Sequence, residues 1–213
     1  MATATAIDET AVQALAPANM LARLAKSILS LFGWRLEAPP PDLNQYVLIA
    51  APHTSNWDFP LMILCAMAYR IKIRWLGKKS LFDPPFGWVM TMMGGLPVRR
   101  SGGHSQVDSI RQVFADNPNL IVAVPPEGTR DHTAHWRSGF YHIAHGANVP
   151  IVGSYLDYSQ KRAGFGEPLY PTGNISADMD VLRTLYAPMR GKYPEKSGAI
   201  KLREEIESDT GSP

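Results

Sequence analysis

YVLIAAPHTSNWDFPLMILCAMAY, residues 46–69, joins two apolar segments through a short polar one. Its first six residues are apolar and partly β-branched, which predicts a buried strand, and its last nine are apolar on every side, which predicts a buried helix. The polar residues 54–56, Thr-Ser-Asn, are strong N-cap types, so we expect the helix to begin after His53. His53 then lies at the end of a strand and Asp58 in the first helical turn, which folds the imidazole back onto the carboxylate.

These two side chains suggest a general base without a protein nucleophile beside it. A carboxylate that holds one ring nitrogen of His53 leaves the other nitrogen free to accept a proton. Ser55 is a poor nucleophile candidate because N-capping already explains it, which leaves a hydroxyl of the substrate. The alternative is structural: His53 caps the helix, and Asp58 only occupies its first turn.

Strands and helices alternate along the rest of the chain, which predicts the class of the fold. Such alternation is typical of an α/β domain with a largely parallel central sheet flanked by helices. We expect one such domain at residues 43–195, because the 213 residues suffice for a single sizeable core. Residues 1–19 are expected to be disordered, 20–42 to form an amphipathic helix and a proline-rich linker, and 196–213 to form a charged, loose tail. The expected strands are 46–51, 71–76, 120–125 and 149–156, and the expected helices are 57–70, a short one late in 82–95, 108–115, 140–147 and 176–190.

MLARLAKSILSLFGW, residues 20–34, has the spacing of an amphipathic helix. Leu21, Leu24, Ile28 and Leu31 recur at steps of three and four residues, with basic residues among them. Such a helix either packs on the surface of the domain or lies in a membrane interface, with its cations toward the lipid headgroups. This segment alone slightly favours packing on the domain.

Composition argues against several classes of protein. A net charge of +2 gives little support to nucleic-acid binding. A single cysteine, Cys65, rules out an intrachain disulfide and a zinc-thiolate site. His132, His135, His142 and His145 form two H-x-x-H pairs, but no carboxylate or thiol completes a zinc pattern, so we expect no metal. We also expect neither a secretory signal nor a membrane-spanning helix.

Two further segments carry side chains that suit an anion. PPEGTR, residues 125–130, follows an apolar strand directly, and open α/β sheets place ligands at such strand ends. Its arginine suits a phosphate and its glycine allows the backbone to approach, but a tight turn with an internal Glu–Arg pair explains the same residues. GGLPVRRSGG, residues 94–103, is a weaker candidate for an anion pocket. The aromatic and methionine-rich run at 86–93 is expected in the core, with an acyl-chain groove or lipid contact as alternatives.

The order of four sequence blocks resembles that of the lysophospholipid acyltransferase family, of the 1-acylglycerol-3-phosphate acyltransferase type. Members of that family carry a His-x4-Asp block, a glycine block ending in arginine, a Phe-Pro-Glu-Gly-Thr-Arg block and a Val-Pro-Ile block. The blocks of this chain are HTSNWD, GGLPVRR, PPEGTR and VPIVGSY, and the resemblance runs from about Val47 to Tyr155. The chain departs from the family pattern at Pro97, Pro125 and Gly153.

The resemblance implies a role for each matching residue. His53 matches the base that deprotonates the acceptor hydroxyl, and Asp58 matches the residue that orients this base. Arg137, in WRSG, stands in the place of the lysine of a Phe-Lys-x-Gly segment. The residues implied to bind the acceptor are Arg100, Glu127, Gly128, Thr129, Arg130 and Arg137.

The resemblance implies acyl transfer from acyl-CoA or an acyl carrier protein to the hydroxyl of a lysophospholipid such as 1-acylglycerol-3-phosphate, without a further cofactor. The expected partners are a lipid substrate, a membrane surface bound through the helix at 20–34, and the acyl carrier protein, but not nucleic acid. We expect a cytoplasmic protein bound peripherally to the inner face of the membrane. Three alternatives stay open: an acyltransferase for an aminolipid or glycolipid acceptor, a thioesterase, and a lipid-binding protein without catalytic activity.

Overall fold

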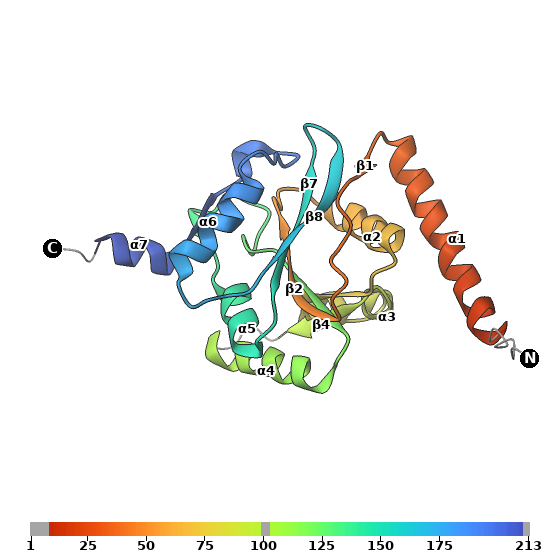
Figure 1. Cartoon of the computed structure of the whole chain (residues 1–213), viewed down its shortest axis with the longest axis horizontal. Coiled ribbons are helices and arrows are strands. Elements are labelled where there is room, and N and C mark those ends of the chain that lie inside the picture. The colour runs from red at the N-terminus through yellow and green to blue at the C-terminus, as the bar shows by residue number, and fades with distance from the viewer. Residues whose placement is uncertain (1–8, 99–102, 211–213) are drawn as a thin grey trace, which may run out of the picture.

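A seven-stranded sheet forms the centre of the computed structural model, which describes residues 9–98 and 103–210 (Figure 1). The strands of the described residues belong to this sheet, except for two that pair separately. They are β1 (Arg35–Leu36), β2 (Gln45–Ala51), β3 (Ile73–Lys78), β4 (Gly95–Val98), β5 (Leu120–Val124), β6 (His135–Trp136), β7 (Ile151–Asp157), β8 (Arg162–Leu169) and β9 (Ala199–Leu202). The α-helices are α1 (Glu9–Leu31), α2 (Asp58–Tyr69), α3 (Gly87–Met92), α4 (Gly103–Asp116), α5 (Gly139–Ala147), α6 (Ile175–Tyr186) and α7 (Arg203–Thr210). Two short 3-10 helices are η1 (Lys79–Phe82) and η2 (Pro194–Lys196).

The sheet has the order β1-β8-β7-β2-β5-β3-β4. Its neighbouring strands are parallel, except for the antiparallel hairpin of β7 and β8. β6 and β9 pair in a separate two-stranded sheet. This arrangement confirms the predicted α/β class with a largely parallel central sheet.

Helices cover both faces of the sheet because its central strand is apolar on both sides (Figure 1). Val47 and Ile49 of β2 belong to a core cluster that α4, α5 and α6 complete. Tyr46 and Leu48 belong to a second cluster, which α2 completes on the opposite face. The alternating side chains of β2 therefore contact α4, α5 and α6 on one face of the sheet and α2 on the other face.

The first helix begins earlier than expected. It starts at Glu9, whereas Met20 was the expected start and 1–19 were expected to be disordered. Alanine, glutamate, glutamine and leucine dominate residues 9–15, and all of them favour a helix. Residues 1–8 lie outside the described ranges.

α1 packs against α2 through a face other than the predicted apolar stripe. Ala22, Ala25 and Leu29 are buried, and the two alanines let the helices approach closely. In contrast, Leu24 and Leu31 are 54% and 82% exposed. The stripe therefore faces away from the domain. Neither α1 nor any other helix in the described ranges has the length and hydropathy that a membrane span requires.

The run at 86–93 is only partly in the core. Met90 packs against the cluster around Trp75, but Phe86, Trp88 and Met92 are 69%, 68% and 72% exposed. The core placement expected for these three residues is wrong, because α3 has fewer than two turns and buries one side only.

The segment at 196–213 was expected to be a loose tail, yet its described part is folded. β9 pairs with β6, and Leu202 is fully buried. The charge of the segment is compatible with packing because the buried Glu205 pairs with Arg183, whose Nη1 lies 2.9 Å from Oε1 of the glutamate. Residues 211–213 lie outside the described part.

Candidate active site

The sheet brings two of the predicted motifs to the same edge. β2 and β5 are neighbours and parallel, with Ile49 opposite Val124. The segment with His53 follows β2, and PPEGTR follows β5. Because the carboxyl ends of parallel strands lie on one side, both motifs meet where open α/β sheets place ligands.

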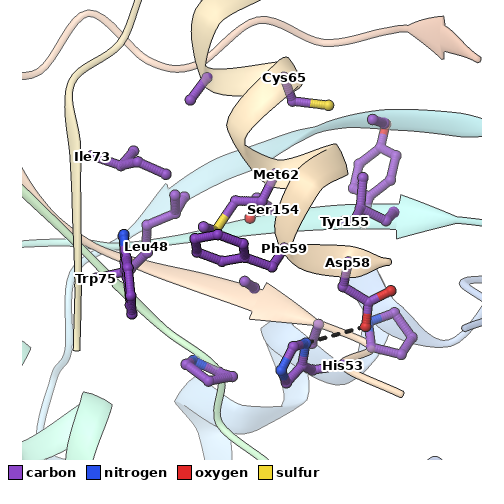
Figure 2. A pocket seen from close by; sticks show the side chains of 18 of the residues that line it. Leu48, His53, Asp58, Phe59, Met62, Cys65, Ile73, Trp75, Ser154 and Tyr155 are labelled. Atoms are coloured by element: carbon purple, nitrogen blue, oxygen red, sulfur yellow. Dashed lines mark ion pairs between the residues drawn. The ribbon is translucent and has the colours of Figure 1, made fainter. Parts of the chain in front are cut away.

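His53 and Asp58 approach each other as the sequence predicts. α2 begins at Asp58, so the residues between the two form a turn instead of a helix. Nδ1 of His53 lies 3.1 Å from Oδ2 of Asp58 (Figure 2). Oδ2 also accepts a hydrogen bond of 2.9 Å from the N–H of Ser55, and Asp58 is only 5% exposed. With Nδ1 donating to the carboxylate, Nε2 is the ring nitrogen that carries the lone pair.

Tyr158 is a further partner of Asp58, and no sequence pattern indicates it. Its hydroxyl donates a hydrogen bond of 2.7 Å to Oδ1 of Asp58. Tyr158 follows β7, the other parallel neighbour of β2, and therefore reaches the same edge of the sheet. The only available signal was its place three residues after VPIVGSY, at the expected end of a strand.

Glu127 lies behind His53. Its Oε2 accepts a hydrogen bond of 2.6 Å from the backbone N–H of His53. Burial raises the pKa of Glu127 to about 7, although the hydrogen bond from His53 lowers it. The carboxylate is thus directed at the backbone of His53, and Glu127 is not part of the cavity wall next to this histidine.

The rest of the PPEGTR loop and Arg137 line the same cavity as His53. Gly128 has a φ of +69°, and a Cβ there would lie 2.5 Å from Nε of Arg137. The loop therefore requires a glycine for its backbone conformation, and the side chain of Arg137 lies directly against it. Thr129 and Arg130 complete this part of the wall.

Arg130 and Arg137 are both exposed, and neither forms an ion pair with another residue of the described ranges. Their guanidinium groups can therefore bind an anion in the cavity. Arg100, the third arginine that was predicted to bind the acceptor, lies outside the described residues.

The cavity extends from these polar residues into an apolar interior between α2 and the sheet. Its volume is about 540 Å³, within the range of ligand-binding pockets. Cys65 also lines it, but burial raises the pKa of this thiol to about 12, which argues against a role as nucleophile. The apolar side chains of the interior include Leu48, Phe59, Met62, Ile73 and Trp75 (Figure 2).

The four histidines of the H-x-x-H pairs lie elsewhere. Nε2 of His142 is 3.1 Å from Oε1 of Glu204, and the ring of His145 stacks on that of Tyr141. Over the described ranges, no three side chains of the metal-ligating types come together. None of the four histidines lines the cavity beside His53.

Two known acyltransferases resemble this chain in sequence or in fold. A protein of *Brassica napus*, "1-acyl-sn-glycerol-3-phosphate acyltransferase BAT2, chloroplastic", is 29% identical over 158 residues, which are 71% of this chain. This chain spans 43% of the length of that relative. The crystal structure of the 1-acyl-sn-glycerophosphate (LPA) acyltransferase PlsC from *Thermotoga maritima* has the same fold, with a TM-score of 0.52 at 16% identity over 92% of this chain and 80% of that one.

The sequence profile of one family covers most of the central sheet and most of the residues that line the cavity. It matches residues 35–156, a stretch that runs from β1 into β7 and includes His53, Asp58 and the PPEGTR loop. The match spans more than half of the 213 residues. On this evidence the chain is a member of the Acyltransferase family.

Proposed function

We propose that the protein transfers a fatty acyl group from a thioester, acyl-CoA or an acyl carrier protein, to the hydroxyl of a lysophospholipid such as 1-acylglycerol-3-phosphate. One observation carries this proposal: His53, oriented by Asp58, shares a cavity with an apolar interior and with two guanidinium groups that form no ion pair within the described ranges. The guanidinium groups suit a phosphate and the apolar interior suits an alkyl chain, and a lysophospholipid carries both. Membership of the Acyltransferase family and the names of the similar proteins support the same reaction.

In the proposed mechanism, Nε2 of His53 accepts the proton of the acceptor hydroxyl as its oxygen attacks the thioester carbonyl. The tetrahedral intermediate then collapses, the C–S bond breaks, and the leaving thiolate takes the proton from the imidazolium. No acyl-enzyme forms, in agreement with the thiol form of Cys65 at the cavity wall. General-base catalysis of this kind contributes a factor of roughly 10² to 10⁴.

The acceptor phosphate binds Arg130 and Arg137, with Arg100 as a further ligand, and Gly128 and Thr129 shape the loop around it. A guanidinium group binds phosphate through two parallel hydrogen bonds, which fixes the orientation of the acceptor relative to His53. Glu127 contributes indirectly, through the backbone of His53.

The protein also binds peripherally to a membrane surface in this proposal, because both substrates carry alkyl chains. The support comes from α1, where Leu21, Leu24 and Leu31 are exposed although the helix is packed on the domain through its other face. The basic residues Arg23 and Lys26 are exposed on the same helix, which suits anionic headgroups. The exposed aromatic side chains around α3 provide a second apolar surface.

A panel of donors and acceptors tests the reaction. The purified chain is incubated with a long-chain acyl-CoA or acyl carrier protein and with lysophosphatidic acid, an uncharged monoacylglycerol, an aminolipid or no acceptor, and both acylated lipid and free thiol are measured. We expect acylated product with lysophosphatidic acid, and thiol release that depends on the acceptor. Thiol release without acceptor identifies a thioesterase, acylation of phosphate-free lipids alone contradicts the role of the arginines, and no reaction at all contradicts the enzyme.

A further inference from the structure

Both oxygens of the Asp58 carboxylate are engaged, and Tyr158 holds the one that faces away from His53. Oδ2 lies 3.1 Å from Nδ1 of His53 and accepts the N–H of Ser55, whereas Oδ1 accepts the hydroxyl of Tyr158 at 2.7 Å. The residues from 53 to 58 form a single turn, so the turn alone holds one edge of the carboxylate. The hydroxyl of Tyr158 holds the other edge, from a strand end that is 100 residues away.

We propose that Tyr158 is a positioning residue that fixes the carboxylate of Asp58 in the plane in which Oδ2 meets Nδ1 of His53, and that Trp34 holds Tyr158 in place. This proposal rests on the proposed function of the His53–Asp58 pair. It extends the active site beyond the part of the chain that the family profile matches, because this match ends at residue 156.

The backbone of Tyr158 is fixed independently of Asp58. Its N–H donates a hydrogen bond of 2.9 Å to the carbonyl oxygen of Arg190. The preceding residue, Asp157, is fully buried and accepts hydrogen bonds from Ser159 and Arg162 on the far side of the turn. The turn between β7 and β8 is therefore a rigid base from which the tyrosine side chain extends.

The ring of Tyr158 is held from the other side by the segment that follows α1. The ring of Trp34 packs edge-on against it, with the centroids 5.1 Å apart and the planes at 85°. Trp34 is itself buried among residues of α1 and α2, and its backbone N–H donates to the carbonyl oxygen of Leu29 at 2.8 Å. A contact at the end of α1 is thus linked to Asp58 through one aromatic side chain.

Tyr158 is suited to donate and not to exchange its proton. Burial raises the pKa of its hydroxyl, and the hydrogen bond to Asp58 raises this pKa further, so that the phenol keeps its proton wherever the enzyme is folded. A protonated phenol beside a carboxylate acts as a fixed donor. The hydroxyl therefore orients Asp58 without entering the proton transfer.

The test begins with Tyr158→Phe, which removes the hydroxyl and keeps the ring on Trp34. We expect kcat to fall roughly tenfold, the order for a lost hydrogen bond to a charged group, while KM for both substrates stays unchanged. The melting temperature falls as well, because Oδ1 of the buried Asp58 loses its donor, and the double variant below separates this loss of stability from the loss of kcat. Tyr170→Phe, at an exposed tyrosine, is the matched control and leaves kcat unchanged. Trp34→Leu lowers kcat in the wild type but has no further effect in the Tyr158→Phe background.

A double variant separates positioning from general stability. If Tyr158 acts through Asp58, Tyr158→Phe has no effect on kcat when Asp58 is already replaced by asparagine. A loss of kcat that is equally large in both backgrounds contradicts the proposal, as does a Tyr158→Phe enzyme with the kcat of the wild type.

An NMR measurement tests the proposal without any assay of acyl transfer. The ¹⁵N shifts of the His53 imidazole report its tautomer, and we expect one tautomer, with hydrogen on Nδ1, in the wild type and a mixture of tautomers in Tyr158→Phe. Identical spectra overturn the positioning role. A wild-type protein that shows the single tautomer but transfers no acyl group contradicts the proposed function and leaves the role of Tyr158 in place.

Discussion

Glu127 is buried against the backbone of His53, the proposed base. This burial links the protonation of the Glu127 carboxylate to the stability of the fold. Burial raises its pKa from 4.5 to about 7, so between these pH values the folded protein binds more protons than the unfolded chain. The free energy of unfolding therefore decreases through this residue as the pH rises from about 4.5 to about 7, and does not change through it at higher pH. Relative to the unfolded chain, the ionised form of Glu127 is disfavoured in the fold by an amount on the order of 3 kcal/mol.

Glu127→Gln removes this titration and keeps an amide oxygen that can accept the N–H of His53. We expect the free energy of unfolding of the variant to decrease less steeply between pH 5 and pH 7 than that of the wild type. Urea denaturation at pH 5, 6, 7 and 8 measures both curves, and other titrating groups cancel in the comparison. If the free energy of unfolding depends on pH equally in both proteins, the pKa of Glu127 is not raised by burial.

Arg130 tests the proposed binding of the acceptor phosphate. We expect Arg130→Gln to raise KM for lysophosphatidic acid roughly tenfold to a hundredfold, because a charged hydrogen bond is lost, while KM for the acyl-CoA donor stays the same. Arg35→Gln, at an exposed arginine of β1 that does not line the cavity, is the control. Steady-state kinetics with each substrate varied in turn give both KM values. An increase in the KM for acyl-CoA alone would show that Arg130 binds the donor and not the acceptor phosphate.

For single residues, local sequence predicts the meeting of His53 and Asp58, because α2 begins only at Asp58. The N-cap position is Trp57 and not one of the residues 54–56, and Ser55 supports the turn by accepting the N–H of Trp57 at its hydroxyl oxygen. The same local pattern carries no information on Tyr158 or on the direction of the Glu127 side chain. Both depend on which strands lie beside β2, and this is a property of the sheet.

At the scale of elements, α1 combines two apolar faces, of which one packs on α2 and the other is exposed. We expect Leu24→Gln combined with Leu31→Gln to weaken binding to vesicles of phosphatidylcholine and phosphatidylglycerol roughly tenfold, since two leucine side chains no longer enter the interface. Co-sedimentation at increasing lipid concentration measures the partition. Unchanged binding contradicts the role of α1.

Two controls locate the contact. Ser27→Gln with Ser30→Gln changes exposed polar positions of the same helix and is expected to leave binding unchanged. Phe86→Ser with Trp88→Ser tests the exposed residues around α3. A loss of binding in this variant alone would assign the membrane contact to α3 instead of α1.

The sequence does not predict β4 and β8, whose residues have a low strand propensity, nor the short strands β1, β6 and β9. β8 contains two glycines and a proline, and its long hairpin pairing with β7 overrides this composition. β4 contains Pro97, which is tolerated because β4 is the last strand of the sheet and needs only one partner. The long apolar segments around β2, β5 and β7, by contrast, are recognisable from sequence because they are buried on both faces.

At the scale of the whole molecule, three adjacent parallel strands deliver the proposed machinery. β5, β2 and β7 lie side by side, and the residues that follow their carboxyl ends are the PPEGTR loop, His53 and Tyr158. The hydrogen bonds from His53 to Glu127 and from Tyr158 to Asp58 join the three strand ends into one site. The α/β class, predicted from alternating strands and helices, implies that a ligand binds at the carboxyl ends of the strands. The order of the strands, which determines the residues that meet at these ends, depends on tertiary packing and is not predicted from the sequence.

The role of His53 as general base is tested by the rate at which His53→Ala transfers the acyl group. Transfer from acyl-CoA to lysophosphatidic acid is measured in single turnover for the wild type, for His53→Ala with and without added imidazole, and for His132→Ala, a control at an exposed histidine outside the cavity. We predict a loss of roughly 10² to 10⁴ in rate for His53→Ala, partial recovery with imidazole, and no change for the control. A His53→Ala enzyme that transfers the acyl group at the rate of the wild type would contradict the account.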